Sequence, residues 1–231
     1  MRTIFFTRVV VLAAVAGFFI AGTAPALAAE AKQGPERWES AMVAFEESDK
    51  ENPPPKGGVL FVGSSSVRMW KTLAEDFPGQ QTINRGFGGS EVSDSIHFAD
   101  RIVLLHKPRL IVMYAGDNDI SRGKTTKEVY ADFKKFVKLI RKELPKTRVA
   151  FIAIKPSLKR WELSGEMKQA NQRIKKRCDG SKMLDYLDIW TPMIGDDGKP
   201  RPELFAEDGL HLNEQGYALW TSVIRPFVDK K

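Results

Sequence analysis

The sequence predicts an α/β fold in which a parallel sheet of five strands is covered by helices on both faces. Short apolar segments alternate along the chain with longer segments whose apolar residues recur at helical spacing. Strands that alternate with helices favour a parallel sheet buried between two helix layers. The 231 residues are 42% hydrophobic and 28% charged, and neither an internal repeat nor a flexible linker divides them. These values suit one globular domain with a sizeable core.

The predicted strands are recognised by apolar runs too short for helices. The run at 109–114 is apolar at every position after Arg109, which indicates a strand buried on both faces. The run at 58–62 has the same character and ends at Gly63. In chain order, the five predicted strands are 58–62, 82–84, 109–114, 148–154 and 183–187.

The predicted helices show one apolar face, and the clearest of them covers 126–144. Thr125 and Thr126 supply a cap signal at its start, and Pro145 ends it. Its apolar residues, Phe133 and Ile140 among them, share one side, as in a helix that packs on a sheet. The other predicted helices are 35–50, 67–77, 93–105, 163–177 and 213–228.

The first residues differ in character from the rest of the chain. Arg2 and Arg8 are followed by an uncharged apolar run at 9–21 and by small residues at 26–28. This order is typical of a cleaved export signal, and the apolar run is short for a membrane span of about 20 residues. An uncleaved anchor is the alternative. We therefore expect a periplasmic or extracellular protein, without stable membrane insertion after cleavage. Its parts would be a signal peptide at 1–28, an N-terminal helix and Pro-rich connection at 29–56, and the main domain at 57–231.

Charge and cysteine content limit the classes of partner. The net charge is +7, and much of the excess lies in 134–148 and 168–177, where basic residues alternate with apolar ones at helical spacing. Such stretches are typical of solvated helix faces, so we expect no nucleic-acid partner. Cys178 is the only cysteine, which excludes an internal disulfide and favours a structural role.

The first candidate for chemistry is the run of three serines, Ser64 to Ser66, that follows the predicted strand at 58–62 and Gly63. A serine at a strand-to-helix turn faces the crevice in which α/β proteins bind ligands. It could attack a carbonyl carbon while backbone amides hold the resulting oxyanion. The alternative is that these hydroxyls only cap the following helix.

Two further polar segments follow predicted strands. The loop at 84–90 contains Gly86, Gly88 and Gly89, but Glu91 occupies the position of the third glycine in a dinucleotide fingerprint. Its glycines could instead bring an amide close to a substrate oxygen, or the loop is only a flexible turn. In the second segment, 114–119, Asn118 could donate its side-chain amide to an oxyanion. The neighbouring Asp117 and Asp119 hold the turn in shape or, alternatively, form a cation site.

The fourth segment, 208–211, precedes the last predicted helix and contains Asp208 and His211. A spacing of three residues on a helical turn places two side chains on one side. The carboxylate can then accept the Nδ1 proton of the imidazole and leave Nε2 free to take a proton from serine. The same spacing occurs at Asp94 and His97, which we interpret as solvated or capping. His106 has no evident partner.

The placement of the four segments strengthens the interpretation that they form one site. Each follows a predicted strand or closes the last strand-to-helix connection, so in a parallel sheet all four should meet at one edge. A nucleophile, oxyanion donors and an oriented base would then converge there.

In these segments the sequence resembles the SGNH (GDSL-like) hydrolases. The order Gly63-Ser64-Ser65, Gly89 behind Asn84, 116–119 and 208–211 is similar to the four sequence blocks of that family. The first block departs from the usual Gly-Asp-Ser, because Ser64 replaces the aspartate. The second block, Asn-x-Gly-x-Gly-Gly, is similar to that of the acetylhydrolase-like branch.

The resemblance implies a three-layer α/β/α fold like that of flavodoxin and a triad of Ser65, His211 and Asp208. It also implies an oxyanion hole formed by the amides of Ser65 and Gly89 and the side chain of Asn118, without metal or organic cofactor. The expected reaction is hydrolysis of an acyl ester of a small molecule or polysaccharide, with a short acyl group such as acetyl. A non-catalytic carbohydrate- or envelope-binding module on the same fold is the alternative. Six residues lie near the proposed edge, where each would shape the pocket, pack in the interior or lie on the surface: Arg68, Trp70, Arg85, Phe87, Arg160 and Trp161.

Overall fold

The structure is a computed structural model that describes residues 34–230. The predicted signal peptide, 1–28, and the first residues of the segment after it lie outside the described residues.

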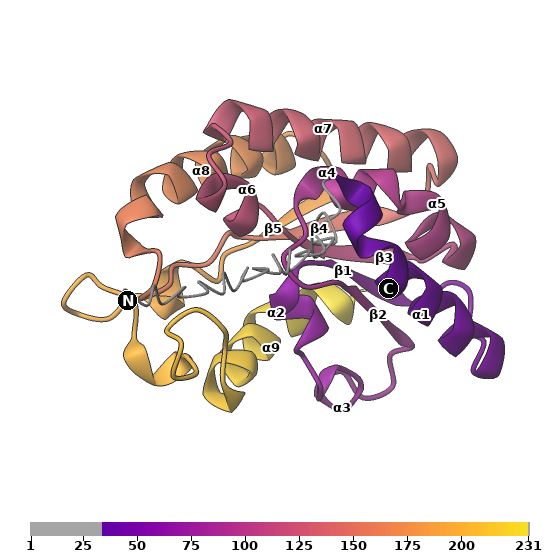
Figure 1. The fold of residues 1–231 in the computed structure, drawn as a ribbon, viewed down its shortest axis with the longest axis horizontal. Coiled ribbons are helices and arrows are strands. Elements are labelled where there is room, and N and C mark those ends of the chain that lie inside the picture. Colours follow the sequence, from indigo (N-terminus) through magenta and orange to yellow (C-terminus); the bar gives the residue numbers. More distant parts are fainter. Residues whose placement is uncertain (1–33, 231) are drawn as a thin grey trace, which may run out of the picture. The chain divides into compact units, whose positions relative to one another are not determined.

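A five-stranded sheet forms the middle of the described region, with the strand order β2-β1-β3-β4-β5 and parallel pairing throughout. The predicted α/β/α fold with a parallel sheet is therefore confirmed (Figure 1). Each strand lies within two residues of its predicted start and end. The strands are β1 (Val59–Gly63), β2 (Thr82–Gly86), β3 (Leu110–Tyr114), β4 (Arg148–Ile152) and β5 (Leu184–Leu187).

Helices cover both faces of the sheet, as Figure 1 shows. One face packs against α1 (Glu39–Glu51), α4 (Val92–His97), α5 (Ala99–Ile102), α7 (Thr126–Glu143) and α8 (Ser164–Asp179). The other face packs against α2 (Ser65–Arg68), α3 (Leu73–Asp76) and α9 (Glu214–Val228). The remaining elements are α6 (Asp117–Ser121) and five 3₁₀ turns: η1 (Pro35–Trp38), η2 (Leu104–His106), η3 (Trp161–Leu163), η4 (Thr191–Met193) and η5 (Pro202–Leu204).

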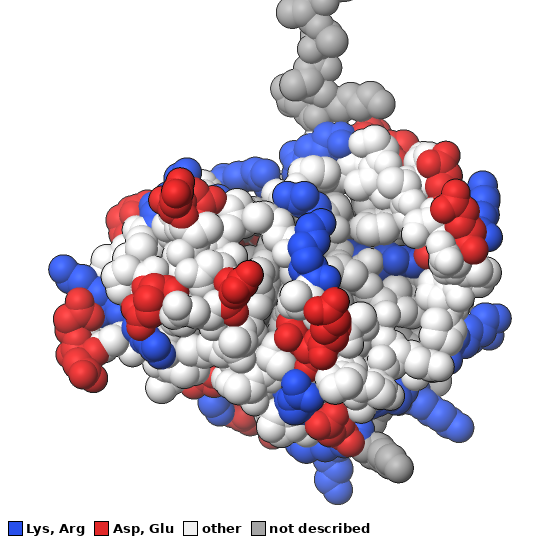
Figure 2. Space-filling model, turned by 90° about the horizontal axis from the view of Figure 1, so that it is seen from below, with Lys and Arg blue, Asp and Glu red and all other residues white. Residues whose placement is uncertain are grey.

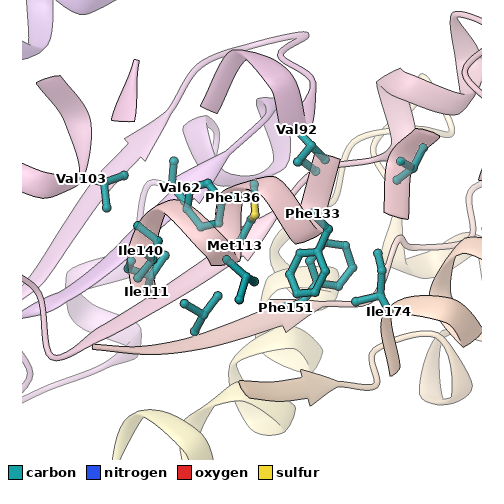
Figure 3. Packing of buried hydrophobic residues seen from close by; sticks show 14 of the residues in the cluster. Val62, Val92, Val103, Ile111, Met113, Phe133, Phe136, Ile140, Phe151 and Ile174 are labelled. Carbon is teal, nitrogen blue, oxygen red and sulfur yellow. The ribbon is translucent and has the colours of Figure 1, made fainter. Parts of the chain in front are cut away.

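The apolar face of α7 forms much of the first core layer (Figure 3). Phe133 packs on Phe151 of β4 with ring centroids 5.1 Å apart. Phe136 and Ile140 of α7 are fully buried with Met113 of β3 in the same cluster. Truncation of one such ring to alanine costs about 3–5 kcal/mol of stability. The helix begins at the predicted position because Thr125 and Glu128 form a reciprocal capping box.

Two predicted helices are broken in the structure. The segment 67–77 is not one helix, because α2 ends at Arg68 and Trp70 turns into the second core layer, where it is 1% exposed. The segment 93–105 divides into α4, α5 and η2 at Phe98 and Val103. Both side chains are buried in the first core layer, so tertiary packing overrides helix continuity.

The basic stretches lie where the sequence predicted them. Lys134, Lys135 and Lys138 of α7 are exposed, while Cys178 at the end of α8 is buried and free. On the face shown in Figure 2, blue and red side chains are interspersed, and no single basic field covers that face. Between residues 34 and 230, no helix is both long and apolar enough to cross a membrane.

Three strands end level with one another at the edge that concerns function. Gly63 of β1 lies opposite Gly86 of β2 and Tyr114 of β3 in the pairing register. The chain runs from β1 to β2 on one side and then to β3 on the other, so the strand order reverses between β1 and β3. This is the topological switch point at which open α/β sheets bind ligands.

Candidate active site

Ser65 is presented at the switch point by the turn that joins β1 to α2. Gly63 has φ of 142°, and a Cβ there would lie 1.8 Å from the Tyr114 carbonyl oxygen, so only glycine fits. Ser65 is the first residue of α2 and is half-buried at the edge of a cavity. Ser64 and Ser66 are only 2% and 1% exposed. Of the three serines, Ser65 is therefore the one whose hydroxyl a substrate can reach.

His211 joins Ser65 to Asp208 in a continuous hydrogen-bonded chain. The Nε2 atom of His211 lies 2.9 Å from Ser65 Oγ, and its Nδ1 lies 2.5 Å from Asp208 Oδ2. Ser65 and His211 are 146 residues apart in sequence, so the fold alone brings them together. The chain has the connectivity of a nucleophile, a base and an orienting carboxylate.

The turn that carries this pair is not the helical turn expected from the three-residue spacing. Asp208 and His211 lie in an irregular turn before α9, in which Gly209 has φ of 62°. Asp208 Oδ1 accepts hydrogen bonds from the backbone amides of Leu210 and His211, each at 2.9 Å. The aspartate thus folds the turn with one oxygen and holds the imidazole with the other.

The electrostatic consequence is a firmly ionised carboxylate at Asp208. Burial by itself would raise the pKa of this group, but its backbone and ring hydrogen bonds with His211 and Leu210 lower the pKa far below the usual range. Asp208 therefore stays negative throughout the range in which a histidine changes its charge.

The other two predicted oxyanion donors line the same cavity as Ser65 and His211. Gly89 follows β2 and adopts φ of 77°. Asn118, in the first turn of α6, donates from Nδ2 to the Ser90 carbonyl at 3.0 Å and accepts from Arg160 at Oδ1 at 3.2 Å. The bond from Arg160 fixes which way the amide faces, because a guanidinium can only donate.

Asn84 holds the serine-bearing helix against the glycine loop. Its Nδ2 donates to the carbonyl of Val67 in α2 at 2.8 Å, and its Oδ1 accepts from the Gly86 amide at 2.9 Å. A Cβ at Gly86 would lie 2.2 Å from the Arg68 nitrogen, so the glycine lets α2 rest on the end of β2. These contacts fix the spacing between Ser65 and Gly89.

The two aspartates beside Asn118 are held by cationic side chains. Buried Asp117 accepts from Lys155 at 3.1 Å and from Arg160 at 2.6 Å; although burial opposes it, these two cations lower the pKa of Asp117. Asp119 accepts from Lys124 at 2.9 Å, and burial raises its pKa. Both carboxylates are thus paired with cations, and no metal-ligating cluster of three or more His, Cys, Asp or Glu residues occurs within 34–230.

The remaining histidines lie away from this site. Asp94 is the N3 residue of a capping box on α4 and is buried, so it caps rather than being solvated, while His97 is exposed. His106 is 2% exposed, with Nε2 3.7 Å from Asp49. Burial, aided by the charge of Arg85, lowers the pKa of His106 to about 4.

The cavity has a volume of about 740 Å³ and is closed on one side by the N-terminal helical segment. Of the six residues placed near the edge by sequence, Arg68, Phe87 and Arg160 line this cavity. The other three serve elsewhere. Trp70 packs in the core, Arg85 is buried in an ion pair with Asp49, and Trp161 stacks on Trp190.

Sequence reasoning missed one wall of the cavity. Trp38 contacts the site directly, since a Cβ on Gly89 would lie 3.2 Å from its ring. The apolar face of this helix was visible in the sequence, but no local signal indicates the surface on which it packs. The missed lining residues are Arg37, Trp38, Ser40, Ala41, Ala44 and Phe45 from η1 and α1, together with Arg122.

Solved structures with similar folds include a GDSL-like lipase and an acetylxylan esterase. A GDSL-like lipase from Bacteroides thetaiotaomicron has a TM-score of 0.68 at 20% identity, covering 85% of this chain and 97% of that one. An acetylxylan esterase from Geobacillus stearothermophilus, in the form of a catalytic mutant, has a TM-score of 0.63 at 14% identity, covering 77% and 96%. At these identities the likeness shows the fold alone.

Sequence comparison supplies the family. No curated protein has a sequence that matches this one closely enough to indicate a relationship. The pattern that defines the GDSL-like lipase/acylhydrolase family matches residues 58–219 of the 231, a segment that contains Ser65, Asn118 and His211. The chain belongs to the GDSL-like lipase/acylhydrolase family.

Proposed function

We propose that the chain is an exported serine esterase that removes a short acyl group, such as acetyl, from a hydroxyl of a small molecule or polysaccharide. The observation that carries the proposal is the 2.9 Å contact between Ser65 Oγ and His211 Nε2, with Asp208 behind the imidazole. Membership of an acylhydrolase family supports the reaction class.

In the proposed acylation step, His211 accepts the hydroxyl proton at Nε2 as Ser65 Oγ attacks the ester carbonyl carbon. Asp208 keeps the other ring proton on Nδ1 and stabilises the imidazolium that forms. His211 then returns its proton to the departing alkoxide, which leaves as the alcohol. The acyl group remains as an ester on Ser65.

Negative charge on the carbonyl oxygen is met by three donors in this mechanism. The donors would be the amides of Ser65 and Gly89 and the Nδ2 of Asn118, and all three residues line the cavity that holds the nucleophile. Asn118 has a second Nδ2 hydrogen beyond the one given to Ser90, which leaves a donor for the oxyanion. Donors placed before the reaction stabilise the developing charge without reorganisation.

Deacylation repeats these steps with water. His211 takes a proton from the water, whose oxygen attacks the acyl carbon, and the collapse of the tetrahedral intermediate returns the proton to Ser65 Oγ. The products are a carboxylic acid and the free enzyme, with no redox change.

A test of the proposal compares Ser65→Ala with Ser64→Ala. The wild type and Ser64→Ala should hydrolyse p-nitrophenyl acetate and bind a fluorophosphonate covalently, while Ser65→Ala should do neither. Ser64 is a suitable control because its side chain is buried beside the nucleophile and makes no cap bond. Full hydrolysis by folded Ser65→Ala refutes Ser65 as the nucleophile. A folded wild type that neither hydrolyses the ester nor is labelled favours a non-catalytic binding module.

Export is a separate part of the proposal and rests on the first residues of the chain. The charged start, the apolar run at 9–21 and the small residues at 26–28 support it. Expression of the full chain in a Gram-negative host, with fractionation and N-terminal sequencing, should yield a periplasmic product that begins near residue 29. A cytoplasmic product that retains Met1 refutes export without bearing on the esterase.

A further inference from the structure

The cavity beside Ser65 has an unusual charge balance. Four of its lining residues are arginines, and none is an aspartate or glutamate. Three of these arginines have carboxylate partners. Arg37 pairs with Asp94 at 3.3 Å, Arg122 with Glu91 at 2.9 Å, and Arg160 with Asp117 at 2.6 Å.

Arg68 is the exception. It is exposed, and within residues 34–230 its guanidinium has neither a hydrogen-bond acceptor nor an ion-pair partner. It lies three residues after Ser65 in α2, and residues at this spacing share one side of a helix. The unpaired charge therefore faces the same cavity as the nucleophile.

The glycine loop is shaped to receive this guanidinium. A Cβ on Gly88 would lie 2.9 Å from Arg68 Nε and 3.5 Å from its terminal nitrogen. Gly88 does not have the positive φ that would call for glycine on conformational grounds. Its lack of a side chain instead leaves room for the arginine next to Gly89, one of the proposed oxyanion donors.

We propose that Arg68 binds an anionic group of the substrate, so that the preferred ester carries a carboxylate or a phosphate near the scissile acyl group. This inference rests on the proposed esterase activity. An arginine fork matches both anions, because its N–H groups donate in parallel to two oxygens. An acyl ester on a uronic acid or on a sugar phosphate has this chemistry.

The test measures kcat/KM on three acetyl esters: an O-acetylated methyl glucoside, the corresponding methyl glucuronide, and an O-acetylated glucose phosphate. For the wild type, kcat/KM on at least one anionic ester should exceed kcat/KM on the neutral ester. In Arg68→Gln, which keeps a polar side chain but removes the charge, the anionic-to-neutral ratio should fall about 10- to 100-fold, as expected for one charge-assisted interaction. The ratio in the wild type should also decline with added salt.

The control is Arg173→Gln, which removes an exposed arginine of α8 that does not line the cavity. Its anionic-to-neutral ratio of kcat/KM should equal that of the wild type. A preference for the glucuronide or for the phosphate identifies the source of the anion. Equal wild-type rates on neutral and anionic esters, or an unchanged ratio in Arg68→Gln, overturn the proposal but leave the esterase standing. A folded wild type that hydrolyses none of the three esters and does not hydrolyse p-nitrophenyl acetate refutes the esterase itself.

Discussion

Single residues at the switch point determine the proposed chemistry, and Asp208 has two tasks there. It folds the turn through the amides of Leu210 and His211 and holds the imidazole through Nδ1. An asparagine would preserve the shape of the turn but would not stabilise the imidazolium or select its tautomer.

Asp208→Asn should therefore lower kcat on p-nitrophenyl acetate by up to about 10⁴-fold, as loss of the triad carboxylate does in serine hydrolases. The melting temperature should change little, because the side chain is exposed. Steady-state kinetics and a thermal melt measure the two effects. Near-normal kcat in the folded variant would contradict the role given to Asp208.

The pH dependence of the wild type follows from the same residue. Because hydrogen bonds lower the pKa of Asp208 far below its usual range, this carboxylate does not titrate between pH 4 and 8. The acidic limb of a plot of log kcat/KM against pH should then fall with a slope no steeper than one, because Asp208 takes up no proton there. A slope of two would show that a second group titrates with it.

Asn118 provides an independent test of the oxyanion hole. Asn118→Ala should reduce kcat by about 100-fold or more while KM changes little, because the donor acts on charge that develops in the transition state. The thermal melt serves as the control for folding. A variant that loses affinity but keeps kcat would assign Asn118 to ground-state binding instead.

At the scale of elements, α1 is the least predictable contributor to the site. Side-chain hydrogen bonds attach η1 and α1 to the rest of the domain: Arg37 and Trp38 donate to Asp94, Arg101 donates to Glu39 and Glu46, and Arg85 donates to Asp49. The first turns of this segment then form a wall of the cavity opposite the catalytic turn.

Ala44 of α1 lines the cavity, so a large side chain at this position should narrow it. Ala44→Trp should lower kcat/KM for an acetylated xylo-oligosaccharide at least about tenfold relative to p-nitrophenyl acetate, since misfit in a pocket affects the larger ligand first. Val43→Trp is the matched control, because Val43 is exposed on the same helix and does not line the cavity. Equal effects of both variants on kcat/KM would show that α1 does not line the substrate pocket.

The elements that the sequence predicted well are those with strong local signals. Thr125 and Pro145 mark both ends of α7, and the apolar run of β3 has no competing interpretation. The prediction of one helix at 67–77 was wrong because Trp70 and Phe77 pack in one aromatic cluster with Phe61. Such tertiary contacts have no signature in the local pattern.

At the scale of the whole molecule, parallel topology explains why the sequence alone predicts that four separate motifs meet in one site. Strands that end level deliver the segments after them to one edge, and the register of Gly63 with Gly86 and Tyr114 achieves this. What topology does not determine is the packing of side chains at that edge. The Arg160–Asn118 contact and the cavity wall from α1 therefore emerged only with the structure.

Stability of the whole domain should depend on pH through His106, which is buried with Asp49 and Arg85 nearby. Its pKa is about 4 in the folded chain, against an ordinary value of 6.5. Below about pH 6.5 the unfolded chain therefore binds a proton that the folded chain excludes, and stability falls until the pH passes about 4.

Melting temperatures between pH 7 and pH 4.5 measure this effect. The wild type and the control His97→Gln, which alters an exposed histidine, should lose more stability on acidification than His106→Gln. Parallel curves for all three proteins would show that His106 does not control acid stability.

The family pattern begins at residue 58, yet the helix at 39–51 closes the substrate cavity. Under the proposed function, the residues that would hydrolyse the ester and the helix that lines the cavity lie in separate stretches of the chain, joined by a proline-containing connection at 52–58. A relative could exchange its leading helix for another and accept a new alcohol while its hydrolytic apparatus stays intact. Chimaeras that swap only this helix offer a direct route to new selectivity.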